Sequence, residues 1–183
     1  MQVDEKTLLN LLADEKSQRK AFNIIVSQYS QRLYWQIRRI VLSHDDANDV
    51  LQNTFIKAWQ GLASFEGRSQ LSSWLYRIAI NEALDFMRRK KQTLSLTDND
   101  GEGHQVAAQL MADEYFDGNE TDAMLQQAIH ELPEVQRTVF QLKYFDNLKY
   151  SEISNILGTT EGALKASYHI AVKKITDFFN SHD

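Results

Sequence analysis

Aromatic and basic side chains alternate within residues 64–91, in a pattern that suits single-stranded nucleic acid. Aromatic rings can stack on unpaired bases, while arginine and lysine neutralise the phosphates. The candidates for this chemistry lie in a short loop and in the helix predicted after it: Phe65, Arg68, Trp74, Tyr76, Arg77, Asn81 and Arg88. A helix with a solvated basic face would explain the charges alone, so the neighbouring rings are what favour nucleic-acid binding.

A second polar group lies upstream, on a helix that the segment Ser43–Asp46 is predicted to cap and that is predicted to end at Gly61. Its apolar positions, among them Ala47 and Leu51, have the spacing of a buried stripe. The polar positions lie in the first turn and on the other faces, where they could meet a partner. They are Asp45, Asp46, Asp49, Gln52 and Asn53.

A third pattern, near the C-terminus, predicts a helix-turn-helix. A helix over Tyr150–Leu157 is followed by Gly158, which can adopt the left-handed conformation, and by a longer helix over Glu161–Phe179. Thr159 or Thr160 can cap the longer helix. The candidate DNA contacts are Thr160, Lys165, Ser167, His169 and Lys173. A plain pair of helices in a bundle would show the same pattern.

The elements that must position these residues are expected to be helical throughout. One proline and seven glycines are too few for the turns of a β-rich fold. Apolar residues between Phe22 and Ile37 repeat at spacings of three and four, which predicts a long amphipathic helix ahead of the acidic one. The predicted fold class is all-α.

Composition excludes several classes of function. The chain has no cysteine, which excludes disulfide scaffolds, thiol catalysis and thiolate metal sites. The N-terminal residues show no apolar stretch behind basic residues of the kind that marks a signal peptide, and no apolar run approaches the roughly 18 residues of a membrane span. We therefore expect a cytoplasmic protein with no membrane insertion. P-loop, GxSxG and HExxH motifs are absent and the five histidines are scattered. We therefore expect no enzymatic activity and no cofactor.

Charge divides the chain into segments. Residues 20–91 carry a net charge of +5, residues 92–122 carry −8 without any lysine or arginine, and the flanking segments are each −1. This segregation predicts two domains, residues 1–91 and 123–183, joined by an acidic flexible linker over residues 92–122. The overall net charge of −5 hides a basic block that could contact phosphate.

Two features of the linker could carry structure. A short helix could form around Val106–Met111. Asp98, Asp100 and Glu102 have the spacing of the first ligands of a calcium loop, but Gln109 stands where a bidentate carboxylate is required. We therefore interpret the acidic groups as a solvated linker without a metal site.

Three ordered segments together indicate a family. DDANDVLQNTFIKAWQGLASFEG, LSSWLYRIAINEALDFMRRK and LPEVQRTVFQLKYFDNLKYSEISNILGTTEGALKASYHIAVKKI resemble an RNA polymerase sigma factor of the extracytoplasmic function (ECF) group. The resemblance covers about residues 20–91 and 121–178. It implies a sigma-2-like helical bundle followed by a sigma-4-like helix-turn-helix.

The resemblance also implies roles for the candidate residues. Those from Asp45 to Asn53 would bind the β′ clamp of core polymerase, and those from Phe65 to Arg88 would open the −10 promoter element and hold its non-template strand, with Asn81 meeting a base. Those from Thr160 to Lys173 would read the −35 element. Many members carry several arginines on this last helix, where this chain has Ala166, Ser167 and Ile170. The implied partners are core polymerase through its β′ clamp and β flap, promoter DNA and an anti-sigma factor.

A free-standing helix-turn-helix regulator is the alternative function. It would have an effector domain in residues 1–120 and would dimerise on palindromic half-sites. That alternative leaves the aromatic and basic pattern of residues 64–91 unexplained. Copurification of core polymerase subunits, as opposed to a lone dimer, would distinguish the two functions.

Overall fold

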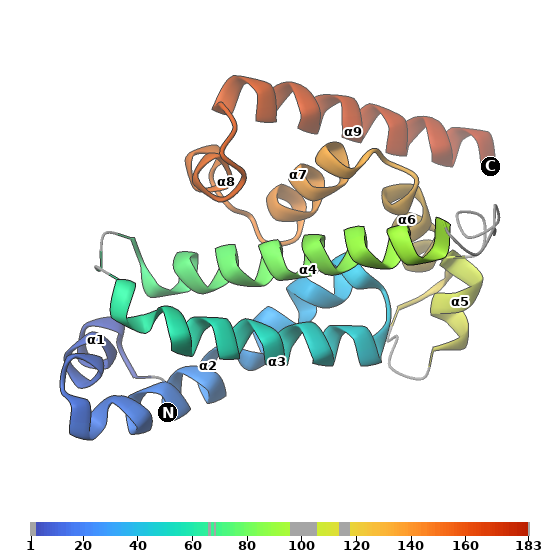
Figure 1. Ribbon diagram of the computed structural model, residues 1–183. Coiled ribbons are helices and arrows are strands. Elements are labelled where there is room, and N and C mark those ends of the chain that lie inside the picture. The colour runs from blue at the N-terminus through green and yellow to red at the C-terminus, as the bar shows by residue number, and fades with distance from the viewer. Residues whose placement is uncertain (1–2, 66, 68, 96–105, 114–117, 183) are drawn as a thin grey trace. The chain divides into compact units, whose positions relative to one another are not determined.

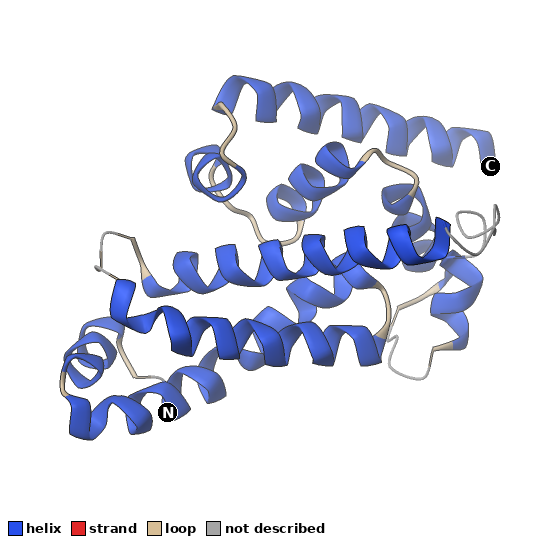
Figure 2. Ribbon diagram, in the orientation of Figure 1, coloured by secondary structure: helices blue, strands red, loops and turns tan. Residues whose placement is uncertain are grey.

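The computed structural model describes residues 3–65, 67, 69–95, 106–113 and 118–182 (Figure 1). Within these residues every regular element is a helix, as Figure 2 shows, in agreement with the predicted fold class. The elements are α1 (Glu5–Ala13), α2 (Glu15–Val41), α3 (His44–Gly61), the 3-10 turn η1 (Leu62–Ser64), α4 (Leu71–Ser95), α5 (Val106–Ala112), α6 (Glu120–His130), α7 (Glu134–Tyr144), α8 (Tyr150–Leu157) and α9 (Glu161–His182).

Helices α1 to α4 belong to the first of two compact units, Met1–Gln92. Its core is built by the apolar stripes of α2 and α4, in which Ile25, Leu33, Ile37, Leu71 and Leu75 are each no more than 1% exposed. Each such side chain contributes about 1.5–3 kcal/mol on burial, so packing rather than helix propensity holds this unit together.

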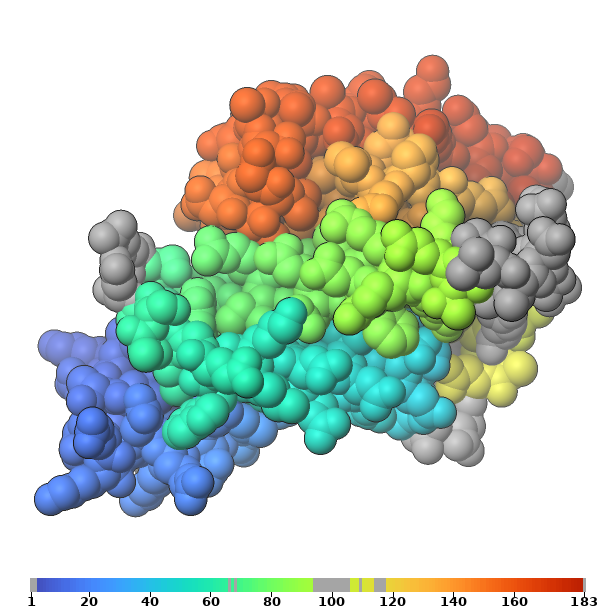
Figure 3. Space-filling view, in the orientation of Figure 1, coloured from blue at the N-terminus to red at the C-terminus, as the bar shows by residue number. Residues whose placement is uncertain are grey.

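Capping residues determine where α3 begins. Helix α2 ends at Leu42, which has the left-handed φ of 63° and donates its amide to Arg38 O at 2.9 Å. The hydroxyl of Ser43 then accepts from the amide of Asp46 at 3.4 Å, which is the predicted cap. Helices α3 and α4 run side by side (Figure 1), and their side chains cover one face of the unit (Figure 3).

The second unit, Thr93–Asp183, contains the helix-turn-helix. Gly158, with φ of 65°, ends α8 and donates its amide to Ser154 O at 2.8 Å, while the Thr160 hydroxyl accepts from the amide of Ala163 at 3.3 Å and caps α9. The underlying core joins α6, α7 and α9 through Ile129, Phe140 and other buried residues. The turn therefore has the chemistry that the sequence predicts.

The segment predicted as a linker contains part of this fold. Helix α4 continues to Ser95, and α5 packs on α6 with Val106 and Leu110 each 4% exposed. Asp98, Asp100 and Glu102, which we interpret as solvated linker residues, lie outside the described residues. In the part of the chain that the structure describes, no helix combines the length and apolar character that a membrane span requires.

Candidate polymerase and DNA interface

The predicted polymerase-binding residues lie on α3 and are mostly open to solvent. Asp45, Asp49, Gln52 and Asn53 are exposed. Asp46 differs, because its side chain is 23% exposed and its carboxylate lies 3.0 Å from Nζ of Lys90 on α4. Asp46 therefore bridges α3 and α4.

An apolar side chain lies within this polar surface. Ile56 follows Gln52 by four residues and Asn53 by three, so the three share one face of the helix. It is 48% exposed. It offers apolar contact area beside hydrogen-bonding and charged groups, a mixture that protein–protein contacts also have. We call the surface formed by Asp49, Gln52, Asn53 and Ile56 the α3 surface.

Two aromatic rings meet where the loop enters α4. Phe65 and Trp74 have centroids 4.8 Å apart and planes tilted by 41°. The indole also lies close to Gly61, where a Cβ would come within 3.3 Å of it. Phe65 is half-buried, so one part of its ring packs on Trp74 while the remainder faces solvent. This pair can offer a stacking surface to an unpaired base.

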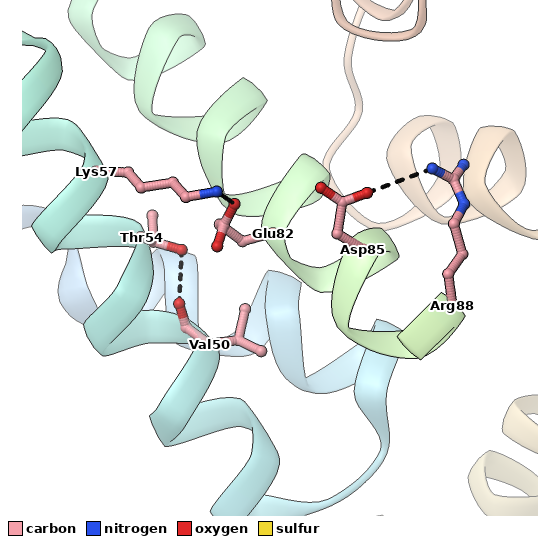
Figure 4. Close-up of polar contacts among 6 residues, drawn as sticks. All are labelled: Val50, Thr54, Lys57, Glu82, Asp85 and Arg88. Atoms are coloured by element: carbon pink, nitrogen blue, oxygen red, sulfur yellow. Dashed lines mark hydrogen bonds and ion pairs between the residues drawn. The ribbon is translucent and has the colours of Figure 1, made fainter. Parts of the chain in front are cut away.

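A polar ridge continues from this aromatic pair along α4. Arg77, Asn81 and Arg88 are exposed, and their spacings of four and seven residues place them on one face of the helix. Arg88 Nη1 lies 3.4 Å from the Asp85 carboxylate (Figure 4). Such a solvent-exposed pair contributes little to stability and can open when a phosphate approaches.

Tyr76, another predicted residue of this group, is not part of the ridge. Tyr76 is 6% exposed, and the guanidinium carbon of Arg32 lies 5.5 Å from its ring centroid. Because its neighbour Arg77 faces solvent, the helical rotation turns Tyr76 inward, where it cannot stack on a base. Arg68 lies outside the described residues.

The N-terminal helix positions the start of α4. The carboxylate of Glu5 on α1 accepts a hydrogen bond from the amide of Leu71 at 2.7 Å, which supplies the N-terminal cap of α4 from 66 residues away. The residues ahead of α1 are held in turn, because the side-chain amide of Gln28 exchanges two hydrogen bonds with the backbone of Val3. Burial, and secondly the charge of Glu5, raise the pKa of Tyr29 on α2.

Replacing Glu5 should loosen this junction. We expect Glu5→Ala to lower the free energy of unfolding of the first unit by about 1 kcal/mol, the usual contribution of a capping side chain. Glu5→Gln keeps an oxygen acceptor and serves as the matched control. It should lower the free energy of unfolding by less than Glu5→Ala does. Urea denaturation measures both. Equal stability of Glu5→Ala and the parent would show that this hydrogen bond does not secure α4.

The candidate DNA contacts of the second unit lie on α9. Lys165, His169 and Lys173 are exposed and follow one another at intervals of four residues, which places them on one face. Ser167 is half-buried and lies to the side of that face. Ile170 on the same helix is 43% exposed.

The tertiary structure adds Lys143 to this group. Its Nζ, on α7, lies 5.2 Å from the ring centroid of Tyr150, and Nζ of Lys165 lies 5.7 Å from the same centroid. Lys143 also donates to Leu148 O at 3.1 Å, which holds it in place. Burial and the neighbouring Tyr168 raise the pKa of Tyr150, so its hydroxyl stays protonated and able to donate. Both ammonium groups thus lie near one aromatic ring, and lysine ammonium groups are common partners of DNA phosphates.

Comparison with known proteins identifies the family. Residues 25–93 match the family described as Sigma-70 region 2, and residues 122–175 match Sigma-70, region 4. The ECF RNA polymerase sigma factor SigW of Bacillus subtilis is 34% identical over 162 residues, which cover 85% of this chain and 87% of the relative. The chain belongs to the ECF sigma factors of RNA polymerase. A sigma-E factor of the same group, from Haemophilus influenzae, is 30% identical over 159 residues, covering 83% and 84% of the two chains.

Two solved structures resemble this sigma factor in fold. CnrH in complex with the cytosolic domain of CnrY gives a TM-score of 0.72 at 21% identity, covering 98% of this chain and 99% of the other. RpoE of Bartonella quintana in complex with the anti-sigma factor NepR gives 0.68 at 24% identity, covering 88% and 98%. At these identities the similarity concerns the fold alone.

Sequence patterns missed three residues that the structure places at this sigma factor's candidate sites. Ile56 could have been found as an apolar residue outside the buried stripe of its helix. Glu5 and Lys143 carry no such signal, because each contributes through a residue on another helix.

Proposed function

We propose that this sigma factor uses residues 1–91 to bind core RNA polymerase and the −10 element, and residues 123–183 to bind the −35 element. Residues 92–122 would connect the two. The observation that carries this proposal is in the first unit, where the α3 surface and the α4 ridge that begins at the Phe65–Trp74 pair lie on two helices joined by ion pairs. A free-standing regulator is not favoured, because residues 25–93 match a sigma-70 region.

The α3 surface is proposed to meet the β′ clamp. Asp49 would supply charge and Gln52 and Asn53 hydrogen bonds, while Ile56 would supply apolar contact at the centre. Desolvated apolar anchors ringed by polar groups account for most binding free energy in protein interfaces. The second unit is proposed to meet the β flap.

The start of α4 is proposed to capture one strand of the −10 element. Phe65 and Trp74 would stack on an unpaired base, Asn81 would hydrogen-bond a base edge, and Arg77 and Arg88 would hold phosphates. Unstacking bases requires a few kcal/mol per step, which stacking offsets only in part. Core polymerase, by holding both DNA and sigma factor, must supply the remainder.

The helix-turn-helix is proposed to read the −35 element through α9. Lys165 and Lys143 would each contact a phosphate of the DNA backbone near Tyr150, while His169 and Lys173 would lie along the groove. We also propose a cytoplasmic location and an anti-sigma protein as partner. The latter is supported by the fold shared with RpoE of Bartonella quintana, which was solved with an anti-sigma factor.

Run-off transcription tests the function as a whole. Purified core polymerase, genomic fragments and this protein should yield discrete transcripts that core polymerase alone does not produce. The protein without core polymerase should bind the same fragments poorly. Tight promoter binding as a dimer, with no transcript when core polymerase is added, would contradict the proposed function.

Removing a phosphate-contacting lysine of the second unit should weaken holoenzyme binding at all −35-dependent promoters to the same extent. We expect Lys143→Ala or Lys165→Ala to weaken −35-dependent binding by the holoenzyme whatever the base sequence, and to lower the salt-dependence slope by about 1, as for a lost phosphate contact.

A promoter library measured at several salt concentrations distinguishes a phosphate contact from a base contact. Lys174→Ala removes one exposed lysine from the side of α9 opposite Lys165, nine residues along the helix; it is the matched control for Lys165→Ala and should have a smaller effect. Relaxed preference at a single base pair would instead assign Lys165 to base reading.

A further inference from the structure

A buried carboxylate lies directly beside the residue proposed to read the −10 base. Glu82, on α4, is 6% exposed, and its neighbours Ile80 and Ala83 are completely buried. Lys57 reaches across from α3 and pairs with the Glu82 carboxylate, as Figure 4 shows. The Lys57 side chain is 56% exposed, so its stem crosses the surface while its ammonium group serves a buried partner.

Stability alone does not account for an acid at this position. Removing a carboxylate from water is unfavourable, and apolar residues of similar volume can replace such an ion pair without loss of stability. An ion pair differs from an apolar contact in fixing the relative orientation of its two groups, because its hydrogen bond forms only over a narrow range of distances and angles. The Lys57–Glu82 pair therefore restricts how α4 can rotate and slide against α3.

The two partners lie next to the two proposed contact sites. Glu82 follows Asn81 in α4, so the rotation of the helix that satisfies Glu82 also decides where Asn81 points. Lys57 follows Ile56 and lies one turn beyond Asn53, at the edge of the α3 surface. Farther along the same two helices, Asp46 and Lys90 form a second ion pair at 3.0 Å. The two helices are thus tied at two separate points.

We propose that Lys57 and Glu82 are positioning residues that hold Asn81 at a defined place relative to the polymerase-binding α3 surface. The inference rests on the proposed role of Asn81 and adds the device that sets its position. When polymerase holds α3, the pair keeps the base-reading side chain of α4 in register with the −10 strand. Preference for a base at one −10 position then depends on an ion pair that touches no DNA.

The decisive variant replaces the pair by apolar residues, Lys57→Met with Glu82→Leu. We expect it to keep parental stability in denaturant and parental affinity for core polymerase. Open-complex rates on promoters substituted at each −10 position should show about a tenfold loss of preference at the position that Asn81→Ala also relaxes, and at no other. Parental preference in a stable double variant would overturn the proposal.

Three further variants make the test complete. Ile80→Val shortens a buried neighbour without touching the pair, and it should lower stability while leaving base preference unchanged. Glu82→Gln removes the ionic attraction without leaving a buried carboxylate unpaired, and it should show part of the same loss of preference if the double variant fails to fold. If Asn81→Ala leaves base preference unchanged, both the role of Asn81 and this proposal are refuted. If Asn81→Ala relaxes the preference but the double variant does not, only the role of the pair is refuted.

Discussion

Phe65→Ala should reduce open-complex formation by about 10- to 100-fold, because stacking on an unpaired base contributes about 1–3 kcal/mol. The ring lies 4.8 Å from that of Trp74 at the entry to α4 and remains partly open to solvent. The same variant should bind core polymerase like the parent, because Phe65 lies outside the α3 surface. Permanganate reactivity of unpaired thymines measures strand opening in the holoenzyme.

Two controls distinguish strand capture from damage to the fold. Trp35→Ala removes a 43% exposed ring from α2, outside the proposed DNA site, and should leave strand opening unchanged. A promoter with a pre-opened −10 bubble should restore part of the activity of Phe65→Ala, since the DNA then supplies the melting. Equal permanganate reactivity of Phe65→Ala and parent on duplex promoters would remove Phe65 from the site.

Asp49→Lys combined with Gln52→Lys should abolish most core binding. Both side chains are exposed on α3 and outside its buried stripe, so the fold should survive with little change in stability. Misplaced charges in an interface weaken binding by several kcal/mol, which corresponds to a loss of about 100-fold or more in affinity for core polymerase. Competition with the parent protein for immobilised core polymerase measures this loss.

The control must change charge by the same amount elsewhere. Asn10→Lys combined with Glu15→Lys adds the same three positive charges to exposed positions of α1 and α2. We expect this control to bind core polymerase like the parent. If the α3 variant and the control bind equally well, the polymerase contacts another surface.

Local sequence patterns determined the helical elements and many of the exposed candidates. Periodicity and capping signals act within a few residues, which is why α8 has the predicted bounds Tyr150–Leu157 and why the turn at Gly158 follows. The same local rules placed Asp49 and Asn81 on solvent-facing sides of their helices. The family followed from the order of the segments along the chain, which needs no coordinates.

Only the tertiary structure decided which helix faces meet, and hence which side chains act together. Tyr76 and Arg77 are neighbours in sequence, but Tyr76 is buried against α2 whereas Arg77 faces solvent. The contacts Glu5 to Leu71, Lys57 to Glu82 and Lys143 to Tyr150 all join different helices. The physical reason is that periodicity identifies an apolar stripe but not its partner. The register and rotation of one helix on another are set by side-chain packing across the core, and these decide the distances among the polar groups at its edge.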